Sequence, residues 1–213
     1  MRRVHKEANA HIVHTYQAYE ALSKRYEGTK IQMNECKRTP QSIVFPFCQG
    51  RTLEELLDER LDEQDAEGFR KLIEEYMHWL SYNEDANISN IDFIFPNILV
   101  DGDTWHVIDY EWTFDFPVPV AFIMWRMIHE LYYRIPKLGA LYTQDDMNHE
   151  FGIEPSDSEI FMAWTMHFTY EYVGSDSLDV YRKERIPVDL SETVRACQEK
   201  KRFRSKLYYD TGS

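Results

Sequence analysis

The chain has 213 residues, of which 43% are hydrophobic and 15% aromatic, and its formal net charge is −13. This composition is typical of a folded protein with a substantial core, and it excludes intrinsic disorder as the default. The negative charge argues against a general binder of nucleic acid or anionic membranes, because such a surface would repel phosphates.

Cysteine usage and apolar runs indicate the compartment. The cysteines, Cys36, Cys48 and Cys197, are odd in number and scattered, which fits free thiols in a reducing compartment rather than a disulfide framework or a zinc site. No signal-peptide core opens the chain. The most apolar run, 118–128, is too short to span a bilayer and contains Arg126. We therefore expect a soluble, cytoplasmic protein without a transmembrane segment.

The first quarter of the chain predicts one helix followed by a small sheet. Apolar residues recur at helical spacing over 7–26. Two short β-like runs follow at 30–33 and 42–47, and Thr39-Pro40 forms the turn between them.

Helical patterns dominate the rest of the chain. Thr52 and Glu55 have the spacing of a capping box before a short helix, and Ser156 and Glu159 repeat that spacing before another. Further helices are predicted at the positions 65–82, 119–133 and 189–208. The second of these is apolar on nearly all sides and is expected to be buried. Together these elements predict an α+β chain that is mainly helical.

The middle of the chain carries a different pattern. The runs 97–100 and 105–108 are rich in β-forming residues and flank an Asp-Gly pair, which is a strong hairpin signal. Such a hairpin folds Asn97 back beside Asp109, with Asp92 just before it. Carboxylate and amide oxygens at one hairpin mouth form a hard site, which Mg²⁺ accepts when substrate phosphates complete its coordination.

This order of residues resembles the catalytic loop and the metal-binding Asp of protein kinases. It is more similar to choline/ethanolamine kinases and aminoglycoside phosphotransferases, because Asp109-Tyr110-Glu111 stands where protein kinases have Asp-Phe-Gly. The resemblance implies ATP and Mg²⁺ as cofactors. It implies that Asp92 is the catalytic residue that orients or deprotonates an acceptor hydroxyl. Asn97 and Asp109 would hold the metal, and Glu111 would be an accessory or outer ligand.

The resemblance also implies a fold, a kinase-like C-terminal lobe with a truncated N-terminal lobe. Residues 1–50 would be the remnant of the N-terminal lobe, with a helix, two strands and the hinge. Residues 51–213 would form the helical C-terminal lobe that carries the catalytic-loop hairpin. Phe45 and Phe47 lie in the implied hinge, along which adenine binds in such folds.

Several departures from the family pattern leave two alternatives open. No glycine-rich loop or clear strand Lys stands ahead of the first helix, and the usual His two residues before the catalytic Asp is Asn90. Only Glu7 and Glu20 stand where the helix Glu is expected, and Asp115 is nearest to an Asp expected further on. Either an upstream domain or partner chain completes the N-terminal lobe, or the chain is a kinase-like module that binds without catalysing.

Three functions follow. The first is ATP- and Mg²⁺-dependent transfer of phosphate to a small-molecule or sugar hydroxyl, and the second is a non-catalytic interaction module. The third is a metal-dependent phosphoester-binding protein. The sequences at 10–12, 45–47 and 109–112 are also similar to kinase-like modules of bacterial cell-surface polysaccharide enzymes, which implies a role in that biosynthesis.

Other motifs indicate no separate chemistry. His11 and His14 lie one helical turn apart, but no third ligand completes a metal motif, so we interpret them as ordinary helix histidines. Neither Gly-x-Ser-x-Gly nor Gly-x-Gly-x-x-Gly occurs, which leaves hydrolase and dinucleotide-binding interpretations without support.

Overall fold

The computed structural model describes residues 8–170 except 41 and 85. It divides the chain into two compact units, Met1–Phe161 and Met162–Ser213, and the site discussed below lies in the first. Among the described residues, no helix has the length and apolar character needed to cross a membrane. The helix predicted at 189–208 and Cys197 lie outside the described residues.

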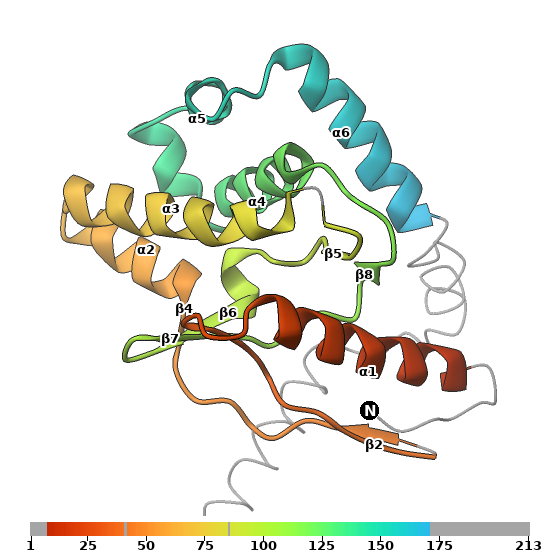
Figure 1. Cartoon of the computed structure of the whole chain (residues 1–213). Helices are drawn as coiled ribbons and strands as arrows, with labels where there is room; N and C mark the ends of the chain where they lie inside the picture. The colour runs from red at the N-terminus through yellow and green to blue at the C-terminus, as the bar shows by residue number, and fades with distance from the viewer. Residues whose placement is uncertain (1–7, 41, 85, 171–213) are drawn as a thin grey trace, which may run out of the picture. The chain divides into compact units, whose positions relative to one another are not determined.

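The chain is α+β with more helix than strand, as expected (Figure 1). The α-helices are α1 (Ala8–Arg25), α2 (Leu53–Asp62), α3 (Ala66–Leu80), α4 (Val120–Arg134), α5 (Gln144–Glu150) and α6 (Pro155–Phe168). The short 3₁₀ helices are η1 (Ser81–Asn83), η2 (Phe95–Asn97) and η3 (Pro136–Ala140). The strands are β1 (Ile31–Met33), β2 (Lys37–Thr39), β3 (Ser42–Val44), β4 (Arg51–Thr52), β5 (Ser89–Asn90), β6 (Ile98–Asp101), β7 (Thr104–Val107) and β8 (Thr113–Phe114).

The predicted hairpin forms the centre of a four-stranded sheet with the order β1-β7-β6-β4. β6 and β7 are antiparallel, and their last pair joins Asp101 to Thr104 across a two-residue turn. Gly102 has φ +56°, the left-handed conformation that the first central residue of favoured hairpin turns requires. β1 pairs with β7 in parallel. The sheet thus joins segments on both sides of the lobe boundary predicted at residues 50 and 51, and that boundary stays a prediction.

The run predicted as one strand at 42–47 is shorter, since β3 covers only its first half. β3 pairs with β2, a strand that the sequence did not predict, and the turn at Thr39 lies where expected. All three residues of β2 are exposed, so it lacks the apolar alternation by which strands are recognised. β3 is held instead by Ile43, which is fully buried in a cluster with Ile12 and Cys36.

The helix starts follow their capping residues. Thr52 and Glu55 form the predicted capping box of α2. The second predicted capping box is wrong, because α6 begins at Pro155 and Ser156 already lies inside it. Pro is favoured at the first helical position, and the Asp157 carboxylate accepts from the Glu154 backbone N–H at 3.1 Å.

α4 is the buried helix that the apolar pattern predicted. Pro119 precedes it directly, as expected. Its exposed residues lie at its two ends, Ala121 at the start and Tyr133 and Arg134 at the end. Its buried residues are Phe122, Ile123, Met124, Trp125, Met127, Ile128 and Leu131.

Candidate active site

The hairpin brings Asn97 and Asp109 together at its open end. The register pairs Ile98 with Val107, and the Ile108 N–H donates to the Asn97 carbonyl at 3.0 Å. Asp109 is the next residue after this pair. The sequence prediction that the hairpin folds these two residues back beside one another is therefore confirmed for the backbone, whereas their chemical roles stay predictions.

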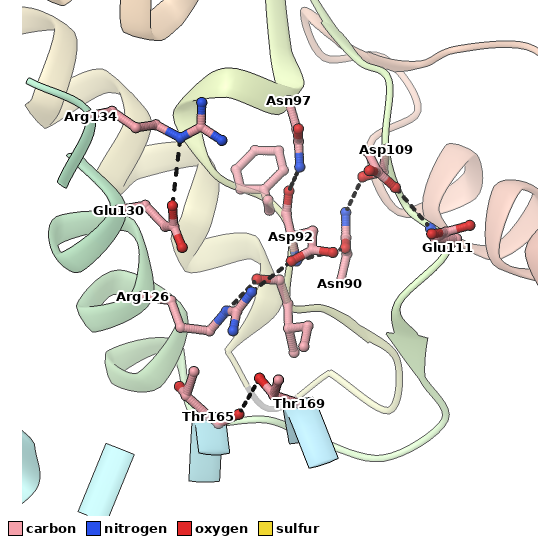
Figure 2. Close-up of polar contacts among 12 residues, drawn as sticks. Asn90, Asp92, Asn97, Asp109, Glu111, Arg126, Glu130, Arg134, Thr165 and Thr169 are labelled. Atoms are coloured by element: carbon pink, nitrogen blue, oxygen red, sulfur yellow. Dashed lines mark hydrogen bonds and ion pairs between the residues drawn. The ribbon is translucent and has the colours of Figure 1, made fainter. Parts of the chain in front are cut away.

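The loop that carries Asp92 is fixed by hydrogen bonds to its backbone (Figure 2). The Asn90 side chain accepts from the Asp92 N–H at 3.0 Å and donates to the Asp109 carbonyl at 3.2 Å. The Asn97 amide nitrogen donates to the Asp92 carbonyl at 3.1 Å. Asn90, which replaces the family's His, thus connects the Asp92 loop to the Asp109 segment.

α3 also packs against the loop that carries Asp92. Tyr76 is fully buried, and its hydroxyl donates to the Phe93 carbonyl at 2.7 Å. The Tyr76 ring stacks on Phe93 with centroids 5.6 Å apart. Because buried polar groups are costly unless they are paired, this hydrogen bond holds the loop at Phe93 against α3.

Arg126 of α4 binds the Asp92 side chain, a contact that the sequence did not predict. Its Nη2 lies 2.8 Å from Asp92 Oδ1, and its Nε donates to the Ile91 carbonyl at 3.3 Å. The side chains of Arg126 and Asp92 are only 12% and 13% exposed. A lone arginine in an apolar helix was the available signal, because buried charged residues are almost always paired.

The electrostatics of the site follow from burial and from three neighbouring carboxyl groups. Burial raises the pKa of Asp92 to about 6, Arg126 opposes this rise, and Asp109 and Glu111 add to it. Burial and Glu111 likewise raise the pKa of Asp109. A cation bound among these groups would relieve their mutual repulsion.

Glu111 is tied to α1. His11 Nε2 lies 3.1 Å from Glu111 Oε2, and His14 Nε2 lies 2.5 Å from the Thr113 carbonyl oxygen. The two histidines therefore hold the segment after β7 against the first helix. Each therefore has a partner outside its own helix.

A cavity of about 230 Å³ lies beside these carboxylates. Its lining residues are Thr15, Phe45, Ile108, Asp109, Tyr110 and Glu111. Three residues predicted for cofactor or metal binding, Phe45, Asp109 and Glu111, therefore surround one space. The predicted hinge residue Phe47 does not line it, and 91% of its surface is exposed.

The donor set fits Mg²⁺ only in part. Asp109 supplies a carboxylate and Asn97 an amide oxygen, both of the hard type that Mg²⁺ prefers. No group of three or more His, Cys, Asp or Glu side chains suited to a metal ion occurs among the described residues. Mg²⁺ commonly takes one or two protein ligands and completes its shell with phosphates and water, so these residues fit a phosphate-bound metal.

The cavity is small for a nucleotide. Pockets that enclose a drug-sized ligand measure roughly 300–1,000 Å³, whereas this one measures about 230 Å³. Its volume leaves room beside Asp109 for a group smaller than a nucleotide. A scan against protein-family models and a search of curated proteins found no match to this chain.

Proposed function

We propose that this chain is a kinase-like phosphotransferase that uses Mg²⁺ and ATP to phosphorylate a hydroxyl of a small molecule or a sugar. The observation that supports the proposal is the β6–β7 hairpin. Its open end sets Asn97 beside Asp109, and the Asn97 side chain bonds to the backbone of Asp92. In kinase-like enzymes, residues in this order hold the metal and orient the acceptor.

Each residue has a role in this proposal. Asp92, with a pKa of about 6, is largely ionised at pH 7 and close to the range in which a general base works best. Arg126 keeps its carboxylate in one orientation. Asn97 and Asp109 would hold Mg²⁺, which neutralises phosphate charge when it is bound, and Glu111 would support Asp109.

A second candidate function is a non-catalytic kinase-like interaction module. It is favoured by the engagement of Asp92 with Arg126 and of Glu111 with His11. A partner chain or upstream domain that covers the phosphates would favour the first function, and a role in cell-surface polysaccharide biosynthesis belongs to either candidate.

Phosphate release from ATP, with water as the acceptor, separates the two candidates. We expect Mg²⁺-dependent release by the wild type and a loss of about a hundredfold or more in Asp92→Asn, the range typical of removing a general base. Asp103→Asn, which removes an exposed carboxylate from the hairpin turn, is the matched control. Nucleotide binding without any release would favour the non-catalytic module.

A further inference from the structure

A second cavity lies away from the candidate active site and shares no lining residue with it. It has a volume of about 660 Å³ and lies between the α2–α3 connection on one side and η3 and α5 on the other. Figure 1 shows these helices grouped at the end of the unit opposite β5 and β8. The proposed phosphotransferase does not use this space.

The interior of this cavity is apolar. Its floor includes Ile73, Leu138 and Met147, which are 4%, 2% and 3% exposed. Four further apolar side chains complete the wall, namely Leu61, Phe69, Leu141 and Phe151. A volume of this size, lined in this way, lies within the range of sites for small apolar ligands.

The charged groups at the rim bind one another. Arg60 pairs with Asp65 at 3.4 Å, and Arg70 pairs with Glu150 at 3.8 Å across the two walls. The Tyr142 hydroxyl also donates to Glu150 at 2.6 Å. Two arginines therefore face two acids, and the remaining charged lining residue is the acidic Glu74.

This balance of charges identifies the class of ligand. An anion would meet two arginines that are already opposed by Asp65 and Glu150, at a rim where three acids outnumber two arginines. A cation would find one lining carboxylate that is not paired with an arginine, that of Glu74, and this side chain faces solvent. An uncharged group loses nothing at such a rim, while its apolar body gains from burial against the floor.

We propose that this cavity, named here the α3–α5 cavity, is a binding site for an uncharged, lipophilic small molecule. The proposal does not depend on the phosphotransferase assignment. The ligand is a small molecule rather than a protein segment, because the volume matches one compact ligand and the Arg70–Glu150 pair joins the two walls of the cavity.

The test uses Nile red, a neutral fluorescent probe, with the whole chain. We expect saturable binding of one probe per chain, and displacement by decanol at concentrations about tenfold or more below those needed with decanoate or decylamine. Ala66→Trp fills the mouth from an exposed position on the first turn of α3, and it should weaken binding about tenfold or more.

Glu67→Trp is the matched control, since it adds the same side chain at the next exposed position, which does not line the cavity. Its binding should equal that of the wild type. Circular dichroism melts of both variants show that the fold is kept. The proposal is overturned if the wild type shows no saturable site, if both variants bind alike, if a charged competitor is the strongest, or if only an amphipathic peptide binds.

Discussion

The Arg126 guanidinium lies 2.8 Å from the Asp92 carboxylate, and both side chains are almost completely buried. The pair joins α4 to the loop before the hairpin. It favours the ionised form of the residue proposed as the base and fixes its orientation. Two of the predictions below rest on this relationship.

Arg126→Met should lower the free energy of unfolding by about 3–5 kcal/mol at pH 7, the usual result of leaving one partner of a buried ion pair uncompensated. The loss should shrink toward pH 5, because Asp92 then takes up a proton and no longer needs a counter-ion. Urea unfolding at the two pH values measures this. A pH-independent loss would contradict the proposed cause.

The control for that experiment is Arg134→Met on the same helix. Arg134 pairs with Glu54 and Glu130 at 3.6 and 3.5 Å, but 46% of its side chain is exposed. Exposed ion pairs contribute little, so we expect a loss of about 1 kcal/mol or less.

Asp92 should also make stability depend on pH. Its pKa is about 6 in the folded chain and 3.8 ordinarily, so between these values the folded chain holds a proton that the unfolded chain has lost. Its contribution to stability is therefore complete below pH 3.8 and lost as the pH rises through about 6. The maximum effect is about 3 kcal/mol.

Comparison with Asp92→Asn isolates this contribution, since the amide does not titrate. The stability of the wild type relative to the variant should fall between pH 4 and pH 7, and the Asp92 carboxyl carbon should titrate near pH 6 in an NMR experiment. A constant difference together with a midpoint near 4 would mean that the carboxylate is not desolvated.

Gly50 has no room for a side chain, because it lies against β6 just before β4. It has φ +130°, and an added Cβ would lie 2.8 Å from the Val100 carbonyl oxygen. Gly50→Ala should therefore cost about 1–3 kcal/mol more than a left-handed glycine in open space. Gly28→Ala provides that comparison, since Gly28 has φ +77° and nothing within 4 Å. Equal melting temperatures for the two variants would show that β4 and β6 can shift to make room for the added Cβ.

Local signals made much of this fold predictable. Helical spacing gave α1, α3 and α4 to within a few residues, the capping box gave the start of α2, and the Asp-Gly pair gave the hairpin. These features depend on neighbours in sequence, so composition and spacing are sufficient to recognise them. The hairpin register then fixes Asn97 beside Asp109 without further information.

Long-range contacts were not predictable in the same way. Arg126 and Asp92 are 34 positions apart, and only the packing of α4 brings them together. The parallel pairing of β1 with β7 and the contact of His11 with Glu111 likewise join distant segments. No local pattern specifies such partners, although the lone arginine in an apolar helix indicated that one existed.

The most direct test of the proposed function is calorimetric titration of the chain with ATP in the presence of Mg²⁺. We expect binding that requires Mg²⁺ and that weakens about ten- to a hundredfold or more in Asp109→Asn, the range seen when metal sites lose supporting groups. Asp103→Asn should bind like the wild type. Absence of binding by the folded wild type, or equal binding by both variants, would contradict a phosphate-and-metal site at the open end of the hairpin.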